Sequence, residues 1–409
     1  MNSSPSALKL LFASGLGMLF DSMDVGLLSF VIAALFVAWH ITPTDAGLLG
    51  SITLIGMAIG SAFAGLFADR VGRKRAFIIT LVIYSIASGV SAFAASIGIL
   101  LVLRFITGLG LGGELPVATT FVLESSPPEV RGRRTVYLET YWALGGIVAA
   151  LIGYLVIPAL TWRIAFAITV LPALYALYLR RTLPETSAFK GLKRTFRFRE
   201  NMANLWSHGN RRKTFVLWVI WFTANFAYYG MFLWLPSVLA LKGFSLVHSF
   251  GYVLIMAIAQ VPGYLAAAWL VDKLGRKWTL ILFSILSAVS ALLFGLSTSL
   301  TDLMTFGLIL NFSNLGAWGA TYLFSVEQYK AASRATGLGW AMGIGKLGGM
   351  IAPYLVGVLV ATHVAFSVIF SLFFLCTFLG LIVLITLGKD ASKEMFEETT
   401  GRAELSTHA

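Results

Sequence analysis

Five ionisable side chains stand within long apolar stretches of the first half of the sequence: Asp21, Asp24, Arg104, Glu114 and Glu139. An ionisable group in such a segment is costly to bury, so by default it is a candidate for function. Carboxylates can take up and release protons, and a guanidinium can bind an anion. These residue types therefore indicate proton transfer or anion binding in an apolar environment.

Asp24 and Arg104 are the pair whose positions match best. Asp24 lies about 21 Å along a helix that begins near Leu10, and Arg104 lies about 30 Å before the end of an oppositely running helix. We expect the two side chains to approach each other across a helical bundle. If the pair opened in a low-dielectric cavity, Asp24 could take a proton, and Arg104 could bind an anion through two parallel hydrogen bonds. The alternative is a static buried salt bridge that fixes helix packing.

The histidines fall at the ends of apolar segments, in loops or in the tail: His40, His208, His248, His363 and His408. A proton carrier in the apolar region must therefore be a carboxylate, namely Asp21, Asp24, Glu114 or Glu139. Glu114 precedes Pro116 in a glycine-rich stretch. We expect its side chain either to face a cavity or to bond a neighbouring helix. We expect Glu139 to be a gate or packing residue.

The second half of the sequence supplies amide and aromatic side chains instead of carboxylates: Asn225, Tyr228, Tyr229, Gln260, Asn311, Asn314, Trp318 and Trp340. Helical spacing places Asn225 with Tyr229 on one face, and Asn311 and Asn314 with Trp318 on another. Amides beside aromatic rings suit a flat aromatic ligand with a polar edge. The alternative for the tryptophans is anchoring at a membrane surface. Lys346 either binds a ligand anion or snorkels and bonds backbone carbonyls.

The elements that position these residues must be membrane helices. Hydrophobic residues make up 58% of the 409 residues and charged residues 12%, with a mean hydropathy of +0.85. A chain this apolar cannot hide its surface in a water-soluble core. Apolar runs predict twelve spans near 10–38, 46–68, 76–95, 98–123, 136–158, 163–180, 214–239, 247–271, 278–297, 302–325, 335–360 and 364–387.

Basic residues gather on one side of these spans, at Arg70–Arg75, Arg131–Arg134, Lys190–Lys213 and Lys273–Lys277. The positive-inside rule places that side, with both termini, in the cytoplasm. This arrangement explains the net charge of +12 without nucleic-acid binding. The first apolar run is too long for a cleavable signal and indicates a retained span. The single cysteine, Cys376, excludes a disulfide framework and a cysteine metal site.

Two motifs recur at one offset. Asp69-Arg-Val-Gly72-Arg73-Lys returns as Asp272-Lys-Leu-Gly275-Arg276-Lys, 203 residues later, and Glu124 with Arg131 returns as Glu327 with Arg334 at the same offset. A shared offset indicates a duplicated six-helix unit. We therefore predict an N-terminal bundle over 1–180, a cytoplasmic linker over 181–213, a C-terminal bundle over 214–388 and a cytoplasmic tail over 389–409.

The duplicated Asp-x-x-Gly-Arg-Lys loop and the segment from Arg104 to Gly113 resemble signatures of the major facilitator superfamily. Four further segments are similar to the bacterial niacin (vitamin B3) transporter branch, which is related to the synaptic-vesicle glycoprotein 2 and organic-ion transporters. They are Leu19–Gly26, Gly112–Ala118, Tyr228–Ser237 and Leu315–Gly319. The resemblance spans nearly the whole chain. It implies an all-α membrane protein made of two pseudo-symmetric six-helix bundles. It also implies that the protein imports a small aromatic carboxylate such as nicotinate.

The resemblance also implies roles for particular residues. In proton-coupled relatives an Asp of span 1 and an Arg of span 4 occupy the positions of Asp24 and Arg104, and motif position favours Asp24 over Asp21 as the proton carrier. The cytoplasmic motif residues correspond to gate elements: Asp69, Gly72, Arg73, Glu124, Arg131, Asp272, Gly275, Arg276, Glu327 and Arg334. A purely topological role for the basic residues is the simpler alternative.

The leading hypothesis is proton symport of nicotinate or a similar aromatic acid by alternating access. A proton-coupled exporter of drugs or metabolites and a non-transporting membrane receptor are the alternatives. No cofactor is expected, because the sequence lacks a Gly-x4-Gly-Lys-[Ser/Thr] motif. An intramembrane enzyme is disfavoured because no histidine lies at mid-membrane to act as a base. The expected partners are substrate, protons and lipid, and the expected form is a monomer in the inner (cytoplasmic) membrane.

Overall fold

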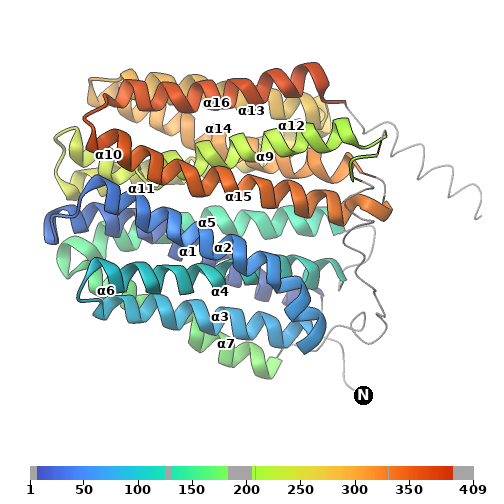
Figure 1. Ribbon diagram of the computed structural model, residues 1–409, viewed down its shortest axis with the longest axis horizontal. Helices are drawn as coiled ribbons and strands as arrows, with labels where there is room; N and C mark the ends of the chain where they lie inside the picture. Colours follow the sequence, from blue (N-terminus) through green and yellow to red (C-terminus); the bar gives the residue numbers. More distant parts are fainter. Residues whose placement is uncertain (1–6, 125–130, 183–204, 208, 330, 390–409) are drawn as a thin grey trace, which may run out of the picture.

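The computed structural model describes residues 7–124, 131–182, 205–207, 209–329 and 331–389. Within these ranges the N-terminal half consists of long helices joined by short loops (Figure 1). Its helices are α1 (Ala7–Ala38), α2 (Pro43–Val71), α3 (Arg73–Val90), the 3-10 turn η1 (Ser91–Phe93), α4 (Ile97–Glu124), α5 (Arg131–Ala159), α6 (Trp162–Ile168) and α7 (Leu171–Thr182).

The C-terminal half repeats this plan. Its helices are α9 (Arg211–Phe232), α10 (Leu235–Leu241), α11 (Leu246–Ile258), α12 (Gln260–Leu274), α13 (Arg276–Leu296), α14 (Leu300–Glu327), α15 (Ala331–Ala361) and α16 (Phe366–Leu387). The twelve predicted spans are thus all helical. Most of the predicted linker, 181–213, and tail, 389–409, lies outside the described residues.

Three predicted spans are interrupted. The sixth breaks between α6 and α7, the seventh between α9 and α10, and the eighth between α11 and α12. A proline follows each break within the first turn of the next helix, at Pro172, Pro236 and Pro262. Proline lacks the backbone N–H that would continue the preceding turn, so helices end before it and restart.

Ten helical stretches among the described residues are long and apolar enough to cross a membrane. The two predicted spans that fall short have separate causes. The α6–α7 span is divided into short pieces, and Asn311 and Asn314 lower the hydropathy of α14. Polar residues in a helix of spanning length are themselves a functional signal.

The duplicated motif loops have the same backbone conformation. Gly72 links α2 to α3 with φ 97°, and Gly275 links α12 to α13 with φ 80°. Residues with a side chain rarely adopt positive φ, so each one-residue turn requires glycine. The sequence repeat therefore corresponds to a structural repeat. The end of the bundle that carries these two turns is called the motif end below, and the opposite end, with Pro43 and Ala361, the far end.

The two halves lie side by side along their length, with α2 of the first half against α15 of the second (Figure 1). Near the far end this packing is backbone against backbone. A Cβ atom at Gly47 would lie 2.5 Å from the Pro353 carbonyl oxygen, and one at Gly357 would lie 2.5 Å from the Pro43 carbonyl oxygen. The Ser51 hydroxyl adds a hydrogen bond to the Met350 carbonyl at 2.6 Å. The far end is therefore closed between α2 and α15.

Candidate functional site

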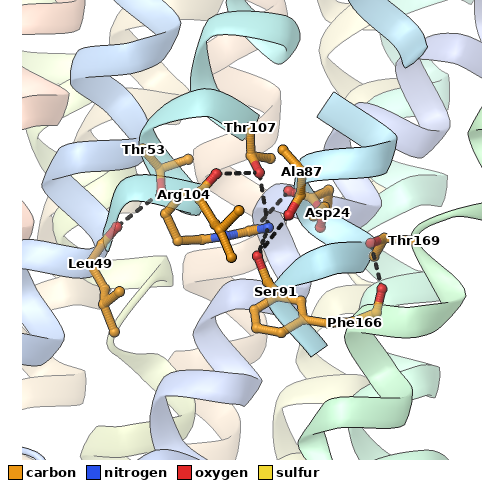
Figure 2. Close-up of polar contacts among 11 residues, drawn as sticks. Asp24, Leu49, Thr53, Ala87, Ser91, Arg104, Thr107, Phe166 and Thr169 are labelled. Atoms are coloured by element: carbon orange, nitrogen blue, oxygen red, sulfur yellow. Dashed lines mark hydrogen bonds and ion pairs between the residues drawn. The ribbon is translucent and has the colours of Figure 1, made fainter. Parts of the chain in front are cut away.

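Arg104 and Asp24 meet inside the N-terminal half, as expected from their positions along the two helices. Arg104 Nη1 lies 3.2 Å from Asp24 Oδ2, and both residues are fully buried (Figure 2). The other terminal nitrogen, Nη2, donates to Ser91 Oγ at 3.1 Å and to Thr107 Oγ1 at 3.0 Å. Ser88 donates to the second oxygen of Asp24. The predicted pairing is confirmed.

The surroundings of Arg104 bear on its predicted second role as an anion ligand. Its guanidinium carbon lies 4.6 Å from the centroid of the Phe166 ring. Phe166, Asp24, Ser91 and Thr107 all belong to the N-terminal half, so the contacts described for the guanidinium come from that half (Figure 2). Arg104 is therefore enclosed by its own bundle in this conformation rather than directed at the C-terminal half.

Asp21 and Glu114 form a second acidic position in the same half. Asp21 lies one turn before Asp24 on α1, and Glu114 approaches α1 from α4. Glu114 Oε1 contacts the position that a Cβ atom would take at Gly17, so the absence of a side chain there lets the carboxyl group reach α1. Both carboxyl groups are buried. The sequence identified both residues, although it did not predict that they would meet.

Aromatic rings line the contact between the halves. Trp142 of α5 donates through Nε1 to the Tyr228 hydroxyl of α9 at 3.1 Å. The Tyr228 ring lies 5.3 Å from the Trp318 ring, and Trp318 meets Trp221 edge-on at 5.6 Å. The predicted cavity role of Tyr228 and Trp318 is consistent with this position between the bundles. Ring faces of this kind can stack on a flat ligand.

The amides point in different directions. Gln260 Nε2 donates to Asn311 Oδ1 at 2.9 Å, and Gln260 Oε1 lies 3.4 Å from the position of a Cβ atom at Gly146 of the N-terminal half. Asn314 instead donates to Ser287 of α13 at 3.2 Å, beside a cavity of about 40 Å³ inside the C-terminal half. The expectation that Asn311 and Asn314 present their amides on one face is therefore wrong, because each amide bonds a different neighbouring helix.

Asn225 and Tyr229 do share a face, as their spacing predicts. A Cβ atom at Gly345 of α15 would lie 2.8 Å from Asn225 Nδ2, and one at Gly349 would lie 2.8 Å from the Tyr229 ring. Asn225 also donates to the Trp221 carbonyl at 2.8 Å. Both side chains therefore face α15.

Lys346 lies on α15 between those two glycines. Its Nζ atom is 5.8 Å from the centroid of the Tyr229 ring, and Tyr229 packs in one hydrophobic cluster with Tyr84 of the opposite half. Lys346 is thus a cation of the C-terminal half that lies at the interface. Trp340, six residues earlier, stacks with Trp218 at 6.4 Å, and Trp218 meets Trp206 near the motif end. Trp340 and Trp318 pack against the same hydrophobic cluster, which includes Trp221.

The gate residues are described only in part. Arg276 Nε lies 2.7 Å from Glu327 Oε1, which joins the two motif elements of the C-terminal half, and the nearby Asp272 is exposed. The side chains of the other charged gate residues lie outside the described residues: Asp69, Arg73, Glu124, Arg131 and Arg334. Their gating role stays a prediction.

Three residues of the interior were not anticipated. Trp142 supplies a hydrogen bond to Tyr228 of the other half, Tyr84 packs beside Phe77 near Gly17, and Tyr264 of α12 packs in one cluster with Leu138 and Trp142 of α5. Each is an aromatic residue in an apolar helix, which sequence reasoning assigns to packing. A polar atom on the ring was the available signal, because a buried Tyr or Trp usually requires a hydrogen-bond partner.

The model of the Major Facilitator Superfamily matches residues 14–263 and 251–406. The chain belongs to the Major Facilitator Superfamily. Its helices also superpose on a D-xylose–proton symporter with a TM-score of 0.77 at 19% identity, covering 94% of this chain and 98% of that one. That likeness supports the two-bundle fold.

The curated relatives of this membrane transporter include vitamin and aromatic-acid carriers. The niacin transporter of Acinetobacter baylyi is 42% identical over 95% of both chains. A Bacillus subtilis protein provisionally named a niacin/nicotinamide transporter is 51% identical over 95% of this chain and 98% of its own. The gentisate transporter of Corynebacterium glutamicum is 29% identical over 84% of this chain and 79% of its own.

Proposed function

We propose that this transporter imports nicotinate or a closely similar aromatic carboxylate together with protons. The observation that carries the proposal is the pairing of aromatic rings with one cation at the contact between the halves. Tyr228, Trp318 and Trp142 offer ring faces, and Lys346 lies beside Tyr229 on the adjacent helix. Nicotinate is a flat ring that carries one carboxylate, so it matches both features. The relatedness to niacin transporters supports the same substrate.

Amides complete the proposed site. Gln260 and Asn311 form a hydrogen-bonded pair that faces α5 of the other half. They offer donors and acceptors for the ring nitrogen of a pyridine. A site with ring faces, an amide and a cation has the composition expected of a small-molecule pocket. Arg104 supports the fold of the site from within the N-terminal half, and Lys346 takes the substrate carboxylate.

Proton coupling rests on the buried acids of the N-terminal half. Asp21, Asp24 and Glu114 are carboxyl groups inside membrane helices, which is where proton-coupled carriers hold their exchangeable proton. Uptake of an anion together with a proton down the proton gradient needs no nucleotide. The relatedness to the xylose–proton symporter concerns the fold alone, so coupling requires its own test.

The test is uptake of radiolabelled nicotinate into proteoliposomes, with and without an acidic exterior. We expect accumulation above equilibrium only with the gradient. Lys346→Met should lower uptake by about ten- to a hundred-fold, the loss expected when a charge-assisted hydrogen bond is removed. The matched control is Lys242→Met, because Lys242 lies at the far end and bonds the Ser297 carbonyl at 2.8 Å.

Each other outcome has a distinct meaning. Uptake that only equilibrates and ignores the gradient would identify a facilitator and reject proton symport. Absence of nicotinate uptake by the wild type would reject the substrate. Equal loss in Lys346→Met and Lys242→Met would reject the specific role of Lys346.

We further propose that the protein is a monomer in the bacterial inner membrane, with the motif end and both termini in the cytoplasm, and that it catalyses no chemical reaction. The basic clusters at the motif end support this orientation through the positive-inside rule. The relatives that share its sequence are transporters, which supports a carrier over an enzyme.

A further inference from the structure

Three buried polar side chains from separate helices of the N-terminal half meet beside Gly17. They are Asp21 of α1, Tyr84 of α3 and Glu114 of α4, each at most 1% exposed. Glu114 Oε1 reaches the Gly17 position, one turn before Asp21 on α1. Tyr84 packs in one hydrophobic cluster with Phe77, whose ring also lies beside Gly17. We call this group the carboxyl pair and its tyrosine.

The hydrogen bonding of the carboxyl pair is incomplete when both groups are written as carboxylates. The carboxyl oxygens of Asp21 and Glu114 have no hydrogen-bond partner of good geometry among the described residues, and neither does the Tyr84 hydroxyl oxygen. Two carboxylates have acceptors but no donor between them, so they can bond only through a proton. Two adjacent negative charges in a low-dielectric interior are also strongly unfavourable. Both facts favour one proton on the pair.

Asp24 differs from the pair in this respect. Its two oxygens are held by Arg104 and Ser88, and its charge is balanced by the guanidinium. An ionised Asp24 is therefore satisfied where it lies. The geometry favours the carboxyl pair over Asp24 as the proton site, in contrast to the expectation from motif position.

The groups that face the pair define its response. Asp24 lies one turn further along the same helix, and Tyr175 of α7 donates to the Ala13 carbonyl of α1 at 3.0 Å. Lys346 of α15 lies beside Tyr229, which packs in one hydrophobic cluster with Tyr84. Lys346 is thus a cation of the other half placed near the pair. A doubly ionised pair attracts its amine more strongly than a singly protonated pair does.

We infer that the carboxyl pair of Asp21 and Glu114 holds the transported proton, and that its protonation releases Lys346 to bind the substrate carboxylate. This inference rests on the proposed function and specifies its coupling step. One carboxylate oxygen takes a proton from water on the far side, which lowers the negative charge that holds Lys346. Loss of that proton to water at the motif end returns Lys346 to the pair and weakens substrate binding. Proton and substrate therefore bind cooperatively.

The test measures nicotinate affinity against pH, by calorimetry on the full-length protein in nanodiscs. The pH range is one in which nicotinate itself stays ionised. Wild-type affinity should strengthen as pH falls, by up to about ten-fold per unit for one linked proton. Asp21→Asn and Glu114→Gln each leave one carboxylate beside an amide donor, which reproduces the charge of the singly protonated pair. Both should bind nicotinate tightly at every pH.

Controls separate this result from a general loss of structure. Ser29→Ala is the matched control on α1, because Ser29 is buried and its hydroxyl donates to the Gly26 carbonyl of its own helix at 2.7 Å. It should keep the wild-type pH dependence. The exchanged pair Asp21→Glu with Glu114→Asp should keep it as well. Lys346→Arg should retain pH-dependent binding, whereas Lys346→Met should bind weakly at every pH.

A second measurement keeps the inference testable if the neutral variants do not fold. Infrared difference spectra of the wild type between high and low pH should show the carbonyl band of one protonated carboxyl group, with a shift in heavy water. Absence of that band would overturn the inference. So would unchanged pH dependence in both folded neutral variants. If the wild type binds no nicotinate at any pH, the proposed function fails instead.

Discussion

At the scale of single residues, the interior of the N-terminal half contains two acidic positions with opposite environments. Asp24 is paired with Arg104 and bonded by Ser88, whereas the carboxyl groups of Asp21 and Glu114 have no hydrogen-bond donor within the described part of the chain. A paired charge is a structural element, and an unpaired buried carboxyl group is available to exchange a proton. The difference between these positions follows from neighbours on α3 and α4 rather than from residue type.

The ion pair leads to a prediction on stability. Asp24→Asn and Arg104→Gln should each destabilise the protein by about 3–5 kcal/mol, because each leaves the remaining buried charge without its partner. The double variant Asp24→Asn/Arg104→Gln removes both charges and should be less destabilised than Asp24→Asn alone. The measurement is the thermal unfolding midpoint in detergent, followed by size-exclusion chromatography. Additive losses in the double variant would contradict a coupled ion pair.

At the scale of helices, close approach between the halves depends on residues without side chains. Gly47 of α2 and Gly357 of α15 allow backbone contact near the far end, and Ser51 bonds across the same seam. Contacts of this kind are typical of membrane helices, where small residues let backbones pack closely. The α2–α15 seam is therefore the element that closes the far end.

The seam leads to a prediction on transport. Gly357→Ala places a methyl group 2.5 Å from the Pro43 carbonyl oxygen, so the seam cannot close as it does in this structure. We expect nicotinate uptake to fall by at least about ten-fold, since alternating access requires closure of each end in turn. Gly343→Ala on the same helix is the matched control, because a Cβ atom there would meet nothing within 4 Å. Equal uptake by the two variants at equal protein yield would show that the seam does not gate.

At the scale of the whole molecule, the two halves divide the proposed work. The N-terminal half holds the acids, and the C-terminal half holds most of the aromatic and amide side chains at the contact. Lys346 lies where they meet, because it belongs to the second half and sits beside Tyr229, which packs with Tyr84 of the first. A charge that acts across the interface can link proton binding in one bundle to substrate binding in the other.

The orientation of the molecule in the membrane gives a third prediction. In a Cys376→Ser background, Ala95→Cys places a thiol in an exposed loop at the far end, and Gly209→Cys places one in an exposed position at the motif end. An impermeant maleimide added to intact cells should label Ala95→Cys and spare Gly209→Cys. Permeabilised cells should show labelling of both. The reverse pattern would invert the proposed topology.

Much of the architecture could be predicted from the sequence, because its signals are local. The lengths of the apolar runs indicated twelve spans. The 203-residue offset of two motifs indicated a duplication, and the positive φ angles of Gly72 and Gly275 agree with it. The approach of Asp24 to Arg104 was also predictable, since rise per residue fixes depth in the membrane once helix direction is known.

Tertiary structure decided which side chains meet. Depth along a helix does not give rotation about its axis, and rotation is set by packing against neighbouring helices. Asn311 and Asn314 therefore bond different helices despite their spacing, and Asp21, Tyr84 and Glu114 converge from three helices far apart in the sequence. The position of Lys346 beside Tyr229, which packs with Tyr84 of the other half, depends in addition on how the two halves sit together. Local sequence patterns specify the membrane helices, their repeat and the identity of the buried charges, whereas the packing of helices specifies which of those charges are paired.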